Sequence, residues 1–280
     1  MNKEFYLQTC YKISELITKR YSTSFSLAVS FLEKEQRSAI YAIYGFVRLA
    51  DEIVDSFHPH DKIFLLNKLT EDLYYSLGHN ISTNTVLMAF ADTVNKYKIP
   101  HSHINAFLES MKRDLNITQY HKQEDLSQYI YGSADVVGLM CLRVFCHNEP
   151  SLYQKLELPA QKLGSAFQKV NFLRDIKSDT QNLGRYYFPE MSTMSLNQQS
   201  KKIIEHSIEQ DFKVAFPGIR QLPGRSKMAV AIAYYYYNSL FIKIIHSSPE
   251  KILSQRIRIS NIKKYLIMVK VCILYFFKRI

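Results

Sequence analysis

Two aspartates one helical turn apart lie in the segment YAIYGFVRLADEIVD, near the N-terminal end of the chain. Five residues of this segment are spaced by three or four positions: Tyr41, Tyr44, Arg48, Asp51 and Asp55. They therefore share one face of a predicted helix. Like charges at this spacing repel by about 0.2–0.5 kcal/mol unless a cation neutralises them. Because no histidine or cysteine accompanies the aspartates, a hard cation fits best, above all Mg²⁺. Taken alone, the pattern also fits a solvated acidic face in which Arg48 pairs with Asp51.

The same arrangement recurs about 120 residues later, in GSAFQKVNFLRDIKSDTQNLGRYYFP. The polar residues that share one helical face there are Gln168, Asn171, Asp175 and Asp179. Arg174 and Arg185 flank the second aspartate pair. If the two helical faces meet, four carboxylates converge on one site, and without bound cations that site would be prohibitively charged.

Several Mg²⁺ ions and a diphosphate would neutralise such a site. Metal ions stabilise the negative charge that develops on a departing diphosphate, and arginines suit its oxygens. The carbocation left behind needs a dry, aromatic wall, because water would quench it. Twenty tyrosines and seventeen phenylalanines supply material for that wall, although most of them are expected to be ordinary core residues.

These side chains have to be positioned by helices, because helical periodicity recurs along most of the chain and no segment alternates as a strand would. Glycine and proline are scarce, with eight of each, which also disfavours a β-rich fold. One all-α domain over residues 1–280 is the simplest interpretation. The predicted helices are 3–20, 35–57, 61–78, 82–97, 101–117, 124–147, 151–179, 198–216, 225–246 and 260–277.

The formal net charge of +11 suggests an anionic partner, whether a phosphorylated substrate, a lipid surface or nucleic acid. Nucleic acid is disfavoured, because the basic residues are dispersed and form no recognised motif. Four cysteines without a CxxC pair indicate neither a disulfide framework nor a zinc site, and they fit a reducing compartment. The first 22 residues lack the apolar core of a secretory signal peptide.

The C-terminal segment KKYLIMVKVCILYFFKRI, residues 263–280, combines an apolar run with flanking basic residues. The run is too short to span a bilayer, which takes about 20 residues. It is either a last core helix or a helix that lies in the membrane interface. We therefore expect a cytoplasmic protein that is peripheral on the inner face of the cell membrane, and no obligate protein partner is inferred.

Four segments together resemble the squalene and phytoene synthases, enzymes that join two isoprenoid diphosphates head to head. YSTSFSLA is similar to the family's S-x-S-F element, and YGFVRLADEIVD to its first aspartate-rich motif. YIYGSADVVGLM is similar to the segment Y-x-Y-x-x-A-G-x-V-G. QKVNFLRDIKSDTQNLGRYYFP resembles the second motif, N-x-x-R-D-x-x-x-D followed by G-R-x-Y-x-P. The resemblance extends along nearly the whole chain.

This resemblance implies an all-α prenyl synthase bundle around a central cavity, with roles for individual residues. The residues it assigns to Mg²⁺, with Mn²⁺ as a substitute, are Asp51, Asp55, Asp175, Asp179 and Asn171. Those assigned to the diphosphate or its metals are Ser22, Ser24, Arg48, Asn171, Arg174 and Arg185. Those assigned to the cavity wall and to steering of the cation are Phe25, Tyr41, Tyr44, Tyr129 and Gln168.

In this family one allylic diphosphate ionises and the cation is attacked by the double bond of a second molecule, which gives a cyclopropylcarbinyl diphosphate. We expect phytoene from two C20 substrates, because Val29, one turn beyond Phe25, is small and should face the far end of the cavity. Squalene or dehydrosqualene from two C15 substrates is the alternative, to which Tyr41 adds mild support. NADPH would be required only for squalene.

Three further observations bear on this interpretation. Asp135 stands where the family usually has glycine, and we expect it to hydrogen-bond backbone amides at a helix kink rather than to add a carboxylate to the cavity. Chain-elongating prenyl synthases carry adjacent aspartates in the second motif, whereas Arg174 precedes Asp175 here. A non-catalytic assembly factor of the same fold would lack the aspartates, and all four are present.

Overall fold

The computed structural model describes residues 2–191 and 196–280. Within these ranges the chain forms thirteen α-helices, a π-helical segment and a short 3-10 turn, and the only β pairing is an isolated bridge between Gln119 and Tyr186. The prediction of an all-α fold is therefore confirmed.

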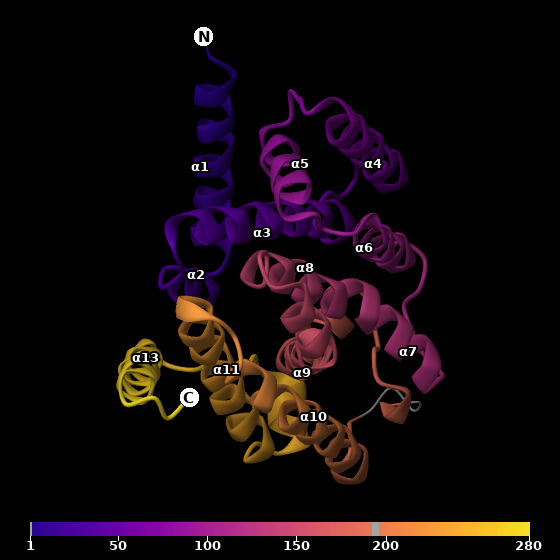
Figure 1. The fold of residues 1–280 in the computed structure, drawn as a ribbon. Helices are drawn as coiled ribbons and strands as arrows, with labels where there is room; N and C mark the ends of the chain where they lie inside the picture. The colour runs from indigo at the N-terminus through magenta and orange to yellow at the C-terminus, as the bar shows by residue number, and fades with distance from the viewer. Residues whose placement is uncertain (1, 192–195) are drawn as a thin grey trace.

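The N-terminal helices form the upper part of the molecule in Figure 1. Their bounds are α1 (Lys3–Tyr21), α2 (Thr23–Val29), α3 (Lys34–Asp55), α4 (Lys62–His79), α5 (Thr85–Tyr97) and α6 (His101–Asp114). The elements that follow are α7 (Gln123–Ile130), η1 (Tyr131–Asp135), α8 (Val136–Phe145), α9 (Pro150–Asn182), η2 (Pro189–Met191), α10 (Gln198–Ile219), α11 (Gly224–Ile245), α12 (Pro249–Ser254) and α13 (Asn261–Phe276).

All ten predicted helical regions are helical in the structure, with ends that differ by up to three residues. The predicted helix 124–147 is divided into α7, the π-helical η1 and α8. The helices α2 and α12 were missed, because seven and six residues make too few turns to establish a 3.6-residue pattern.

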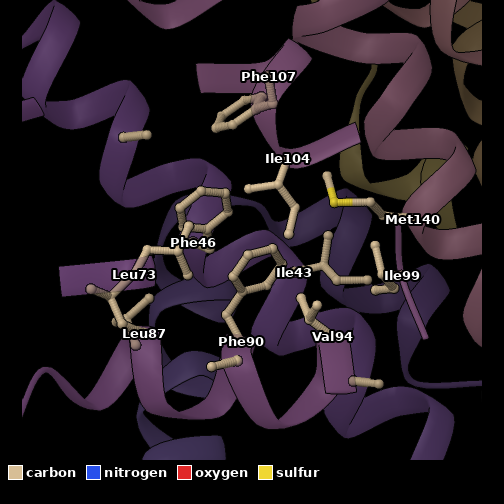
Figure 2. Close-up of a cluster of buried hydrophobic side chains, with 14 of the residues drawn as sticks. Ile43, Phe46, Leu73, Leu87, Phe90, Val94, Ile99, Ile104, Phe107 and Met140 are labelled. Atoms are coloured by element: carbon tan, nitrogen blue, oxygen red, sulfur yellow. The ribbon is translucent and has the colours of Figure 1, made fainter. Parts of the chain in front are cut away.

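A hydrophobic core fixes α3 among its neighbours. Figure 2 shows Phe46 of α3 beside Phe90 of α5, and the two rings stack with centroids 4.1 Å apart. Phe107 of α6 closes the same cluster at 5.4 Å from Phe46. Because α3 buries this face, its remaining face can carry the polar residues of the first motif.

Helix α9 occupies the centre of the molecule, where Figure 1 shows it nearly end-on. It packs against α8, α10, α11 and α12 and against the π-helical segment. A Cβ atom at Gly164 of α9 would lie 2.9 Å from the carbonyl oxygen of Ala134, so only glycine permits this approach. This close packing holds α9, which carries the second motif, against the π-helical segment.

A short extended segment after α9 is tied to the loop that follows α6. The amide of Tyr186 donates to the carbonyl of Thr118 at 2.7 Å, and the amide of Tyr120 donates to the carbonyl of Tyr186 at 3.2 Å. Gly184 has a φ of +65°, which allows the chain to turn directly after the helix. These contacts determine where Arg185 points.

Candidate active site

The two aspartate pairs lie close together, and Arg185 connects them. Its Nη1 donates to Oδ1 of Asp55 at 2.7 Å, while its own amide donates to the carbonyl oxygen of Asp179 at 2.9 Å. The Arg185 side chain is 7% exposed. The end of α3 and the end of α9 therefore meet at Arg185, α3 through the guanidinium and α9 through the backbone amide, as the sequence analysis requires of a shared site.

The pKa values of these carboxyls reflect the proximity of the two pairs. Burial, followed by the charges of Asp175 and then Asp55, raises the pKa of Asp179 to about 7. Burial, followed by the charge of Asp55, raises the pKa of Asp51 to about 6. The Asp51 side chain nevertheless keeps 40% of its exposure, so solvent reaches this carboxylate.

Arginines neutralise three of the four carboxylates. Arg48 Nη1 lies 3.1 Å from Asp51, and Arg185 pairs with Asp55. Arg174 Nε donates to both oxygens of Asp175 at 3.0 Å. In the part of the chain that the structure describes, the Asp179 carboxylate has no ion-pair or hydrogen-bond partner. Binding of metal and diphosphate would release the arginines from the carboxylates, and the freed guanidiniums could bind phosphate oxygens.

The residues present fit Mg²⁺ brought together with a diphosphate. Within residues 2–191 and 196–280, no three histidine, cysteine, aspartate or glutamate side chains converge on a single ion position. Mg²⁺ typically takes one or two carboxylates and completes its shell with water and substrate phosphates. Two carboxylates per helix match this coordination preference. The Asp179 carboxylate, which has no partner among the described residues, is available to bind the ion.

A pocket of about 210 Å³ adjoins the second motif. Its lining residues are Arg174, Asp175, Lys177, Ser178, Gln181, Asn182 and Arg256. Three of these side chains are cationic, so the pocket next to Asp175 can accept an anion. The wider apolar cavity expected for two prenyl chains stays a prediction.

Aromatic side chains line the region between α2, α3 and α11. Phe25 and Tyr44 stack with ring centroids 5.0 Å apart. Tyr237 of α11 stacks on Phe167 at 3.9 Å, and its hydroxyl donates to Oδ1 of Asn171 at 3.2 Å. An aromatic wall therefore reaches the polar face of α9, one turn before Asp175.

The polar residues of α2 and α9 are also near this wall. Ser22 is the N-cap of α2, where its hydroxyl accepts the amide of Phe25 at 3.3 Å, and Ser24 is half-buried on the same helix. Gln168 Nε2 donates to the Ser133 hydroxyl at 3.4 Å. Ser22 thus has a structural role in ending one helix and beginning the next, whatever it binds.

Tyr41 is not brought to the acidic site, whereas Tyr129 reaches its margin through Asp114. Tyr41 is 2% exposed and lies in the core, where the nearest charges are those of Glu15, Lys19 and Arg37. It stands at the edge of the predicted stripe, and packing of α1 against α3 covers it. Tyr129 is 3% exposed within a stack of aromatic rings, and its hydroxyl donates to Asp114 at 2.8 Å.

Asp114 and Arg256 are site residues that the sequence analysis missed. The Asp114 carbonyl accepts Arg185 Nη2 at 2.9 Å, and burial raises the pKa of the Asp114 carboxyl to about 7. Arg256 Nε lies 2.6 Å from Asp175. No sequence spacing relates either residue to the aspartate motifs, because each reaches the site through tertiary packing.

Asp135 differs from its expected role. It ends the π-helical segment, is 8% exposed, and its Oδ1 accepts the Ser165 hydroxyl at 2.8 Å rather than backbone amides. Burial raises the pKa of Asp135 to about 7. The carboxyl therefore lies between η1 and α9, and its partner is a side-chain hydroxyl rather than the predicted backbone amides.

Comparison with known proteins agrees with this geometry. The family described as squalene/phytoene synthase matches residues 18–263. The chain is 30% identical over 210 residues to 4,4'-diapophytoene synthase of Staphylococcus haemolyticus, covering 73% of this chain and 70% of the relative. It is 25% identical over 280 residues to phytoene synthase of Mycobacterium tuberculosis, covering 92% and 89%.

Among solved structures, a dehydrosqualene synthase crystallised with a ligand superimposes with a TM-score of 0.84 at 23% identity, covering 96% of this chain and 97% of the other. At this identity the likeness shows the fold. The match of the family extends over most of the chain and includes both aspartate motifs. The chain therefore belongs to the squalene/phytoene synthase family of prenyl-transferring enzymes.

Proposed function

We propose that the protein is a Mg²⁺-dependent phytoene synthase, which joins two geranylgeranyl diphosphates through a cyclopropylcarbinyl (prephytoene) diphosphate and so serves carotenoid biosynthesis. The observation that supports this most is the Arg185 bridge, since it unites two carboxylate pairs from distant parts of the chain. Such a site suits substrates whose leaving group is a diphosphate.

The acidic residues would hold the metal, and the arginines would orient the diphosphate. The proposed metal ligands are Asp51, Asp55, Asp175, Asp179 and Asn171. Bound Mg²⁺ would stabilise the negative charge on the leaving group as its C–O bond breaks. Arg48, Arg174 and Arg185 already lie beside the carboxylates, so small side-chain rotations would bring them to phosphate oxygens.

The aromatic residues would exclude water from the cation. Phe25 stacks on Tyr44, and Tyr237 stacks on Phe167 while its hydroxyl contacts Asn171 of α9. Aromatic rings beside the bound substrate would stabilise positive charge. Gln168, on the same face of α9, would help to hold the substrate in place. The half-buried Ser24 could donate its hydroxyl to a phosphate.

The C20 substrate is favoured by Val29. It ends α2, one turn beyond Phe25, and is buried against the hydrophobic core. Its small side chain would leave room for a longer substrate where the expected cavity reaches it. Farnesyl diphosphate is the second candidate. Its support is the similarity to a diapophytoene synthase and to the fold of a dehydrosqualene synthase.

A product assay would test the proposal. Purified protein is incubated with Mg²⁺ and either geranylgeranyl or farnesyl diphosphate, with and without NADPH, and the lipid extracts are analysed by mass. A C40 hydrocarbon formed without NADPH is expected. A C30 hydrocarbon would select the second candidate, with NADPH dependence separating squalene from dehydrosqualene.

Two controls make the assay specific. EDTA should abolish turnover, and Asp175→Asn should reduce kcat/KM by at least about 100-fold, because it removes a ligand that acts on the transition state. Absence of hydrocarbon from folded protein with both substrates would refute the catalytic proposal.

A further inference from the structure

Helix α13 carries a continuous apolar stripe on its outer face. The large apolar residues exposed there are Ile262 (73%), Tyr265 (58%), Leu266 (63%), Val269 (49%), Ile273 (52%) and Phe276 (80%), and Phe277 (66%) follows the helix end. Their spacings of three and four place them along one face of the helix. Contiguous apolar surface of this kind marks an interaction site.

The opposite face of α13 is already used. Ile267 and Val271 are buried against α11, and Figure 1 shows α13 beside α11 at the edge of the molecule. Lys270 Nζ lies 5.1 Å from the ring centroid of Tyr235 on α11. The helix is therefore held in place by its inner face, and the described part of the chain leaves its outer stripe uncovered.

The surroundings of the stripe are strongly basic. The last thirty residues contain eight lysines and arginines and no aspartate or glutamate. A hollow of about 400 Å³ lies at the start of α13. Lys243 of α11, His246 directly after α11 and Lys263 of α13 are among its lining residues. Two copies of this face would repel each other, whereas an anionic surface would attract it.

We propose that α13 lies flat on an anionic lipid bilayer, with its outer stripe in the interface and its basic residues at the headgroups. Its 16 residues extend about 24 Å, less than the roughly 30 Å of a hydrocarbon core, so it does not span. Helix α11, by its length and composition, is the one described helix that could cross a membrane, but it packs against α2, α9, α10 and α13 as a core helix does.

The lipid-facing helix is directly connected to the acidic site. Arg256, which pairs with Asp175, precedes α13 by only four residues, and Lys264 Nζ lies 3.5 Å from the Thr23 hydroxyl of α2. If the proposed function holds, the membrane that dissolves substrate and product lies next to the site that processes them.

Vesicle flotation tests this proposal without substrate. The probes are vesicles of phosphatidylcholine alone and of equal parts phosphatidylcholine and phosphatidylglycerol. The test variant is Leu266→Glu/Ile273→Glu/Phe276→Glu. A matched control, Phe5→Glu/Ile63→Glu/Phe64→Glu, changes side chains that are 63%, 57% and 62% exposed on α1 and α4.

Wild type and the control variant should bind the anionic vesicles, and the α13 variant should bind at least about tenfold more weakly. Lys263→Gln and Lys278→Gln should each weaken binding to anionic vesicles by about fivefold. Unchanged binding of the α13 variant would overturn the proposal. The proposal would also be overturned if sedimentation showed that the wild type is a dimer that does not bind vesicles and that the α13 variant is a monomer.

Two further measurements keep the result interpretable. Circular dichroism confirms that each variant is folded. Turnover in detergent micelles should be equal in wild type and in the α13 variant, because detergent replaces the bilayer. If the wild type showed no turnover, the proposed function would fail. Vesicle binding does not depend on turnover, so it would still test the role of α13.

Discussion

Arg256 contacts the Asp175 carboxylate through two nitrogens: Nε lies 2.6 Å from Oδ1, and Nη2 lies 3.3 Å from Oδ2. The two residues are 81 positions apart in the sequence. Since Arg174 also binds this carboxylate, Asp175 is the most heavily paired acid of the site. A metal ion must displace at least one of these guanidiniums before it can bind there.

Arg256→Gln should therefore lower the Mg²⁺ concentration needed for half-maximal turnover, because one competitor for Asp175 is lost. It should also raise KM for the diphosphate by about tenfold, because the pocket loses a cation. Steady-state kinetics in detergent with Mg²⁺ and substrate varied independently would measure both. Arg258→Gln, an exposed arginine two residues away, is the matched control. An unchanged Mg²⁺ requirement would contradict the competition argument.

Arg185→Gln should reduce the free energy of unfolding in metal-free buffer by about 3–5 kcal/mol, because it leaves Asp55 without its partner near Asp51 and Asp114. Arg185→Lys should recover only part of this loss, since an ammonium cannot reproduce the fork that binds Asp55 and the Asp114 carbonyl. Urea unfolding provides the measurement. Equal stability of Arg185→Lys and wild type would show that charge alone matters.

Asp135→Asn should change how stability depends on pH. Burial raises the pKa of Asp135 from 3.8 to about 7, so between these values the folded state holds a proton that the unfolded state has lost. The contribution is therefore complete below pH 4 and declines as the pH rises towards 7. The charges closest to this carboxyl are those of Lys162, Lys169 and Asp211.

The stability of Asp135→Asn relative to wild type should thus increase with pH, by up to about 1.4 kcal/mol per pH unit across this window. Chemical unfolding at several pH values would show the slope. Asp125→Asn, at an exposed aspartate of α7, serves as the control. Parallel pH profiles for Asp135→Asn and wild type would rule out a neutral buried carboxyl.

Gly132→Ala should destabilise the fold by about 1–3 kcal/mol, because the new Cβ would overlap the Ser110 hydroxyl and the carbonyl oxygen of Ala106. Gly78→Ala should instead stabilise by about 0.5–1 kcal/mol, since a Cβ there has no neighbour within 4 Å. Thermal unfolding of the two variants side by side distinguishes a packing effect from helix propensity. A stabilising Gly132→Ala would contradict the close contact between η1 and α6.

The aspartate motifs could be predicted from sequence because helix geometry is local. Asp51 and Asp55, or Asp175 and Asp179, share a face wherever their helix lies. The convergence of the two pairs was only a conditional expectation, and it is the contacts of Arg185 with Asp55 and Asp179 that show the pairs together. By the same local argument Tyr41 was placed on the acidic face, but packing against α1 decided its position instead.

The remaining site features depend on tertiary contacts that no spacing reveals. Arg256 reaches Asp175 only because α12 packs on α9. Asp114 faces Arg185 because the bridge at Tyr186 holds the segment after α9 against the loop after α6. The π-helical segment depends on a close approach between Gly164 and Ala134, and sequence periodicity gives no sign of it.

The arginine–aspartate pairs bear on whether the site needs a resident metal ion. The guanidiniums of Arg48, Arg174, Arg185 and Arg256 pair with three of the four motif carboxylates, and among the described residues the Asp179 carboxylate has no such partner. Because three of the four carboxylates already have arginine counter-ions, the site should stay assembled without a resident ion, and the protein should remain folded through prolonged chelation. Under the proposed function, Mg²⁺ would then be required for turnover but not for folding.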